Sequence, residues 1–237
     1  NTIHMKKLIL FSSIALALMS CNNDDNTNNE PQNPSDNNQI LKLKEFRALA
    51  TSKYFYHENG FVDSTSVLNV GLIRTEIQTK LHYSLENTLS SMEQWIHLVN
   101  SGEKIYEKVV FEYNSENLIN IKRIYDENQN LKQTVNYSYN SEGYIFGSDL
   151  IYVDGNLVQN GSISYSYDNK KNPFYEMYPM AYVRMNQINK NNQTSTANTT
   201  ETLEVINWSY NQNGYPVSFQ KSPVIQDDID YAEFIYY

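Results

Sequence analysis

The sequence predicts an all-β protein, built as one antiparallel up-and-down meander of roughly 11 to 13 strands that is strongly curved or barrel-like. Three observations predict this fold. Tyrosine is abundant, with 20 copies against 9 phenylalanines and 2 tryptophans, and tyrosine suits strands that have one wet face. A turn motif recurs at spacings close to multiples of 14 residues. Between these turns, apolar and polar residues alternate as they do in half-buried strands.

The turn motif consists of an aromatic strand end, a turn rich in Asn and Asp, and an apolar restart. Clear copies start at Tyr56, Tyr113, Tyr139, Tyr167 and Tyr210, and weaker copies start at Ser84 and Tyr125. The spacings between successive starts are 28, 29, 12, 14, 28 and 43 residues. Asn, Asp and Gly tolerate the left-handed backbone of tight hairpins, so each repeat is predicted to be one strand plus one turn. Short turns make neighbouring strands antiparallel, and a twisted sheet of this length curls or closes.

One face of these strands is apolar and aromatic, and we expect it to be the concave face of the sheet. Its predicted members are Val109, Phe111, Tyr113, Val135, Tyr137, Tyr139, Ile163, Tyr165, Tyr167, Ile206, Trp208 and Tyr210. The intervening residues form the polar face, namely Glu112, Asn136, Ser138, Ser164, Ser166, Asn207 and Ser209.

Two segments break the repeat. Residues 186–201 are polar and of low complexity, which predicts a long mobile hairpin loop. Residues 89–100, which contain Trp95, fit either a strand or a short amphipathic helix, because their apolar residues recur at spacings of 3 and 4.

The first 40 residues predict export and anchoring to a membrane. Residues 1–20 contain Met5-Lys6-Lys7 and then an apolar run too short for the roughly 20 residues of a membrane span, so a cleaved signal peptide is expected. The segment Leu18 to Cys21 resembles a bacterial lipobox, which implies lipidation of Cys21. Residues 21–40 then form a flexible polar tether, because they lack the apolar side chains needed to fold. Residues 41–237 form the single β-meander domain.

The expected location is the outer membrane, either on its periplasmic face or on the cell surface. Asp24-Asp25 resembles the acidic surface-export signal of Bacteroidota lipoproteins, which would favour the cell surface. The only membrane contact expected is the lipid on Cys21. The formal net charge of −9 argues against nucleic acid as a partner.

The stretches YNSEGY, YSYDNKKNPF and YNQNGYP resemble the YD-type repeats of RHS-like proteins. They are still more similar to repeats in small Bacteroidota lipoproteins that carry an uncharacterised domain with a porin-like fold. The resemblance covers about Tyr54 to Tyr237 and implies an architecture. It implies no functional residue apart from the lipobox cysteine, Cys21.

The sequence shows no catalytic motif and no metal or cofactor site. His57, His82 and His97 have no metal-binding spacing, and a lipidated Cys21 leaves no thiol. The carboxylates that a glycosidase would need are placed at predicted turns, namely Asp126, Glu127, Glu142 and Asp168. We therefore expect a protein that is not an enzyme.

The expected function is non-enzymatic binding of a ligand or partner at the cell envelope, such as a glycan or an envelope protein. Trp95 and Trp208 are the candidate ligand-binding residues, because exposed aromatic rings stack on sugars. Trp208 is expected to be core, since it alternates with Ile206 and Tyr210. The alternatives are a structural or assembly lipoprotein and, third, a carbohydrate-active enzyme.

Overall fold

The computed structural model describes residues 41–71, 73–223 and 230–237. The predicted signal peptide, Cys21 and the tether lie outside the described residues. Within the described parts of the chain, no helix has the length and hydropathy to span a bilayer.

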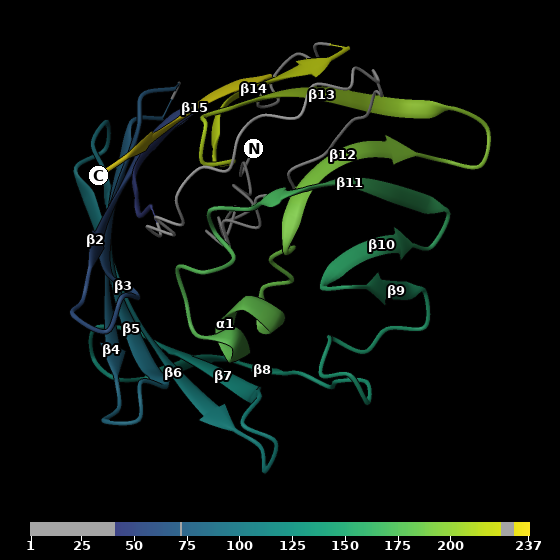
Figure 1. Ribbon diagram of the computed structural model, residues 1–237. Coiled ribbons are helices and arrows are strands. Elements are labelled where there is room, and N and C mark those ends of the chain that lie inside the picture. The colour runs from purple at the N-terminus through teal and green to yellow at the C-terminus, as the bar shows by residue number, and fades with distance from the viewer. Residues whose placement is uncertain (1–40, 72, 224–229) are drawn as a thin grey trace, which may run out of the picture.

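One antiparallel sheet of 15 strands makes up almost all of the described structure, which confirms the predicted all-β meander (Figure 1). Its first half consists of β1 (Leu43–Arg47), β2 (Ala50–Tyr56), β3 (Val62–Asn69), β4 (Thr75–Tyr83), β5 (Leu89–Leu98), β6 (Glu103–Tyr113), β7 (Ile119–Tyr125) and β8 (Leu131–Asn136). Its second half consists of β9 (Leu150–Val153), β10 (Asn156–Asn160), β11 (Ile163–Lys171), β12 (Asn191–Ala197), β13 (Thr202–Tyr210), β14 (Pro216–Ser222) and β15 (Tyr231–Tyr236). The one helix among the described residues, α1 (Met180–Met185), lies between β11 and β12.

The sheet is strongly curved but does not close into a barrel. The first and last strands, β1 and β15, pair with each other, and the free edges are β8 and β9, which are consecutive in the chain. All neighbouring strands are antiparallel, so the two ends of this 15-stranded order run in the same direction. Between the two edges, the chain forms only an isolated bridge, from Tyr139 to Ile145, and Tyr144 stacks on Tyr152 with ring centroids 4.6 Å apart.

The predicted number of strands, 11 to 13, was too low, and the prediction of a mobile loop over residues 186–201 was wrong. Residues 191–197 form β12, which pairs with β11 and β13. A backbone ladder does not require apolar side chains, and several of the polar ones here are hydrogen-bonded within the protein. The Asn192 side chain, for example, donates to the carbonyl of Lys171 at 3.2 Å. The strands β9 and β10 are also shorter than the spacing of the repeat motif suggested.

The sequence of residues 89–100 fits either a strand or a helix, and the structure has a strand there. Residues 89–98 form β5 and pair with β4 and β6. The register between β4 and β5 shifts between His82 and Tyr83, because Ser90 is an extra residue on β5. Such a β-bulge separates two inward-facing apolar residues, Leu89 and Met92, by three positions instead of two, and this produced the helix-like spacing.

The recurring turn is held by its Asx side chain. In three copies, the Oδ1 atom of Asn114, Asn140 or Asn211 accepts the backbone N–H groups two and four residues later, at 2.9 to 3.1 Å. The residue three places after the Asn has a positive φ, which is why this place is occupied by glycine or asparagine.

Six tyrosines, four of which end their strand, each donate a hydrogen bond to a backbone carbonyl beside a β-bulge. The pairs are Tyr56 with Leu43 (2.8 Å), Tyr83 with Val62 (2.6 Å), Tyr113 with Leu89 (2.8 Å), Tyr139 with Ile119 (2.5 Å), Tyr167 with Leu157 (2.5 Å) and Tyr236 with Pro216 (2.9 Å). In all six pairs, the accepting residue lies directly at a register shift. The hydroxyl therefore bonds a carbonyl at a position where the ladder is irregular.

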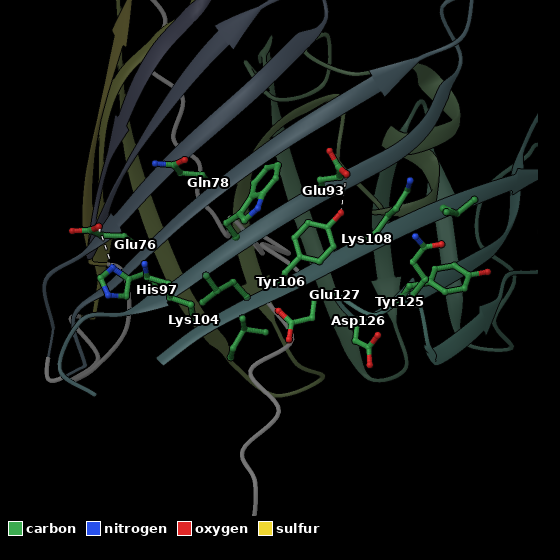
Figure 2. A pocket seen from close by; sticks show the side chains of 15 residues that line it. Glu76, Gln78, Glu93, His97, Lys104, Tyr106, Lys108, Tyr125, Asp126 and Glu127 are labelled. Atoms are coloured by element: carbon green, nitrogen blue, oxygen red, sulfur yellow. Dashed lines mark hydrogen bonds and ion pairs between the residues drawn. The ribbon is translucent and has the colours of Figure 1, made fainter. Parts of the chain in front are cut away.

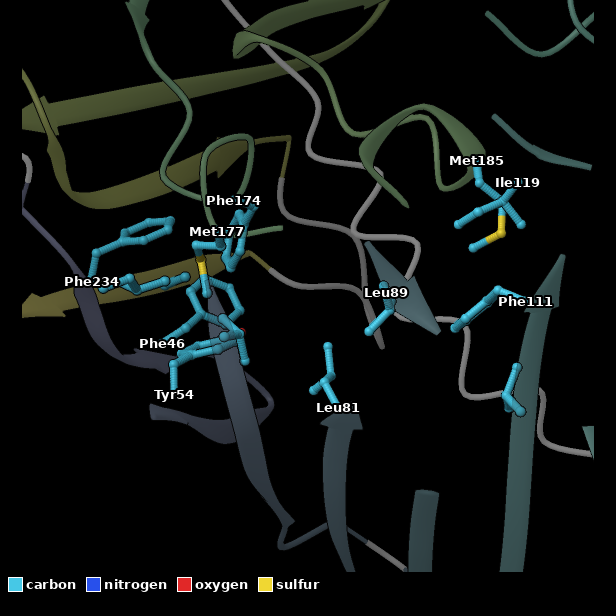
Figure 3. Packing of buried hydrophobic residues seen from close by; sticks show 14 of the residues in the cluster. Phe46, Tyr54, Leu81, Leu89, Phe111, Ile119, Phe174, Met177, Met185 and Phe234 are labelled. Carbon is cyan, nitrogen blue, oxygen red and sulfur yellow. The ribbon is translucent and has the colours of Figure 1, made fainter. Parts of the chain in front are cut away.

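The core lies on the concave face, as the sequence predicted. Val109, Phe111 and Ile206 are buried there, and Tyr113 and Tyr137 pack against them. The segment between β11 and β12 enters the curve and covers this core from within (Figure 1). Figure 3 shows Phe174 and Met177 from this segment beside Phe46, Tyr54 and Phe234, and Met185 of α1 beside Ile119. Because the concave side is filled here, the convex face of these strands is the side that faces solvent.

Replacing Tyr113 by Phe should lower the free energy of unfolding by about 1 to 3 kcal/mol, because the carbonyl of Leu89 loses its hydroxyl donor. Urea denaturation followed by circular dichroism measures this change. Tyr231→Phe is the matched control, since its exposed hydroxyl bonds only the Glu233 carboxylate. Equal stabilities of Tyr113→Phe and the control would show that the tyrosine bonds do not stabilise the sheet.

The fold should also lose stability in alkali. Burial raises the pKa of Tyr113, Tyr152 and Tyr182 from 10.0 to about 12. The unfolded chain therefore releases its phenolic protons first, so this contribution to stability is complete below the unfolded pKa and is lost as pH rises through the folded pKa. Urea midpoints should fall steadily between about pH 9 and about pH 12. A midpoint that stays constant over this window would contradict the role of the buried phenols.

Candidate ligand-binding groove

A hollow of about 1050 Å³ lies on the convex face of the sheet, over β4, β5 and β6 (Figure 2). The turn after β7, residues 126–129, adds one wall. The strand pattern explains which side chains reach it. Met92 on β5 and Val109 on β6 pack against the concave core, so the residues next to them, such as Glu93 and Lys108, project from the opposite face.

An aromatic pair lines the centre of the groove. Trp95 on β5 stands directly opposite Tyr106 on β6, with ring centroids 5.6 Å apart and an interplanar angle of 55°. On its other side, Trp95 stands opposite Gln78 of β4. The indole is 44% exposed, so much of its surface is available for contact with a ligand.

Glu93 orients this aromatic pair. The Tyr106 hydroxyl donates to Glu93 Oε1 at 2.7 Å, and His82 Nε2 lies 3.0 Å from Glu93 Oε2. The hydrogen bonds from Tyr106 and His82 lower the pKa of Glu93, and partial burial together with the Glu93 charge raises the pKa of Tyr106 to about 12. At neutral pH, an ionised carboxylate thus faces a protonated phenol, and each Glu93 oxygen keeps a lone pair for a ligand.

Further polar groups surround the pair. His97 Nδ1 lies 3.6 Å from Glu76 Oε2 at one end of the groove. Lys104 and Lys108 flank Tyr106 on β6, and neither forms a salt bridge with any residue that the structure describes. Both signs of charge therefore lie within reach of the same aromatic surface.

At the wall, Asp126 serves the turn. Its Oδ1 atom accepts the backbone N–H groups of Asn128 at 2.9 Å and Asn130 at 2.8 Å, and the side chain of Asn130 donates to Oδ2 at 3.1 Å. These hydrogen bonds, led by the Asn130 side chain, lower the pKa of Asp126. Glu127 lines the groove beside it.

The two tryptophans predicted as candidates lie on opposite faces of the sheet. Trp95 lines the groove, whereas Trp208 belongs to the core, as its alternation predicted. The Trp208 ring lies 5.0 Å from that of Phe219, and its Nε1 donates to the carbonyl of Gln193 at 3.0 Å. Only Trp95 therefore remains a ligand-binding candidate.

Asp168 does not lie at a turn, which corrects the prediction. It is part of β11, where it accepts hydrogen bonds from the Tyr210 hydroxyl and from Asn192. Tyr210 is thus a repeat tyrosine that bonds a side chain instead of a carbonyl at a bulge. Asp126, Glu127 and Glu142 do lie at turns, as predicted. In the described ranges, no cluster of His, Cys, Asp and Glu could hold a metal ion.

Sequence reasoning missed most of the groove, including Gln78, Glu93, Lys104, Tyr106 and Lys108. A signal was present, because Glu93-Trp95-His97 and Lys104-Tyr106-Lys108 each occupy alternate positions. This alternation could be interpreted only once residues 89–98 were known to form a strand and the register of that strand with β6 was known.

Comparisons with known proteins do not assign this chain to a family. No family model and no curated protein matches this chain. Among solved structures, the chain is similar to a porin-like protein from Bacteroides uniformis ATCC 8492, at 12% sequence identity and a TM-score of 0.27. That match covers 79% of this chain and 70% of the other. The fold described above rests on the strand pairing itself.

Trp95→Ala should cost about 1 kcal/mol or less in unfolding free energy, because the ring is exposed, whereas Trp208→Ala should cost about 3 kcal/mol through loss of core contacts. Urea denaturation of both variants tests this. Similar losses in the two proteins would mean that Trp95 is a structural residue, contrary to its place in the groove.

Proposed function

We propose that this protein is a non-enzymatic binding protein of the cell envelope, and that the convex-face groove binds a neutral glycan. The observation that carries the proposal is the exposed Trp95 ring, held against Tyr106 among carboxylate and ammonium groups. An exposed tryptophan alone would need no explanation. Its combination with an oriented partner ring and unused polar groups supports a binding role.

The groups of the groove complement a sugar. The Trp95 and Tyr106 rings offer apolar surface to the apolar face of a pyranose. Each sugar hydroxyl is both a donor and an acceptor, so it can donate to Glu93 and accept from Lys104 or Lys108. A ligand with hydroxyls uses both kinds of group, whereas a purely apolar ligand would leave them unpaired.

The charges favour a neutral ligand over an anionic one. The carboxylates of Glu76, Glu93, Asp126 and Glu127 line the groove, against the ammonium groups of Lys104 and Lys108. The protein as a whole carries a formal net charge of −9. An acidic polysaccharide would therefore meet repulsion both at the groove and at long range.

Binding without hydrolysis is supported by the state of two carboxylates. A glycosidase needs one carboxylic acid with a raised pKa as its proton donor. The pKa values of Glu93 and Asp126 are instead lowered by hydrogen bonds, so both carboxylates serve better as fixed acceptors.

The proposed location follows from the sequence alone. A lipid on Cys21 and a polar tether would hold the domain at the outer membrane, on the cell surface or on its periplasmic face. A glycan of the envelope or of the surroundings is then within reach of the groove.

Affinity electrophoresis of the full chain in gels that contain glucan, mannan or xylan tests the proposal. We expect at least one of these neutral polysaccharides to retard the protein more than alginate or pectin does. Trp95→Ala should weaken that retention about fivefold or more, because losing an aromatic contact costs about 1 kcal/mol or more.

Tyr231→Ala is the control for this experiment, since it removes an exposed aromatic ring from β15, outside the groove. It should leave the retention unchanged. Absence of retention by every neutral polysaccharide, or retention that survives Trp95→Ala, would refute the proposal.

A further inference from the structure

We infer that the ligand is a polymer chain that crosses the strands from the groove to a second aromatic contact at Phe55. The inference rests on the proposed function and narrows the ligand class from glycans in general to chains of several sugar units. The register of the sheet, the exposure of Phe55 and the polar side chains along the path carry it.

Phe55 lies on the same convex face as Trp95. Its neighbours on β2, Tyr54 and Tyr56, pack against the concave core, so Phe55 points outward. The ring is 47% exposed. Its cross-strand neighbour on β3 is Ser64, whose side chain is too small to cover it.

The pairing of the strands defines a path between the two aromatic sites. Glu93 of the groove stands opposite Lys80 of β4, Lys80 opposite Ser64 of β3, and Ser64 opposite Phe55. Three strand spacings of about 4.8 Å separate Glu93 from Phe55, which gives about 14 Å across the sheet. Trp95 lies two residues from Glu93 along β5, so the two aromatic rings are too far apart for one sugar unit to contact both.

Between the two sites, the path passes over Lys80 and the small side chain of Ser64. The row beside the path continues from Trp95 to Gln78 and then to Ser66. Within the path, Lys80 Nζ lies 2.5 Å from Asp63 Oδ1, and the Ser64 hydroxyl donates to Asp63 at 3.1 Å. These contacts hold Lys80 toward β3. The serine, amide and ammonium groups along the path can bond the hydroxyls of a sugar chain.

A length series tests the inference. The full chain is titrated calorimetrically with the disaccharide and the hexasaccharide of whichever polysaccharide retards it in the gels. The hexasaccharide should bind at least about fivefold more tightly, because a second aromatic contact adds about 1 kcal/mol or more. Phe55→Ala should remove most of that gain and leave the disaccharide affinity unchanged. Trp95→Ala should weaken both ligands, and Tyr231→Ala neither.

The outcomes separate this inference from the proposed function. If Trp95→Ala weakens binding but Phe55→Ala leaves hexasaccharide binding intact, or if both ligands bind equally well, the second contact is wrong and the groove stands. If Trp95→Ala changes neither affinity, both fail. Far-ultraviolet circular dichroism of each variant confirms folding, and Phe55→Leu, which keeps an apolar side chain but removes the ring, replaces Phe55→Ala if that variant does not fold.

Discussion

The hydrogen bond from a tyrosine hydroxyl to a carbonyl beside a bulge shapes the whole sheet. Each bulge bends a strand and disturbs its ladder, and a buried carbonyl without a donor would be costly. The tyrosine hydroxyl supplies the donor from the next strand while its ring enlarges the core. Because of these six bonds, the sheet can be curved by bulges while its concave face is buried.

The same constraint determines where a ligand can bind. Strand-end tyrosines must point inward to reach their carbonyls, and the segment between β11 and β12 fills the space beside them. Alternation then sends Glu93, Trp95 and Tyr106 outward, where they meet only because β5 and β6 pair in one register. A groove lined by outward-pointing side chains on the convex face thus accompanies an interior made of aromatic residues.

The parts of this structure that could be predicted from sequence are those set by local chemistry. The Asx turns, the antiparallel meander and the inward face of Val109, Phe111 and Ile206 follow from short-range patterns. Residues 191–197 could not be predicted as a strand, because their backbone pairing with β11 and β13 compensates for a polar composition. The groove was missed because the contact between Trp95 and Tyr106 depends on the register of two strands. In addition, the bulge at Ser90 gave one of these strands a helix-like spacing of apolar residues.

The odd number of strands has a geometric consequence for the opening between β8 and β9. Since β1 pairs antiparallel with β15, the two free edges run in the same direction, and they could join directly only through a parallel ladder. One more strand between β8 and β9, antiparallel to both, would close the sheet into a barrel with an even number of strands. The connection from 137 to 149 already runs in that position and forms a single bridge, Tyr139 to Ile145. Whether the sheet in this architecture is open or closed therefore depends on whether one connection forms a strand.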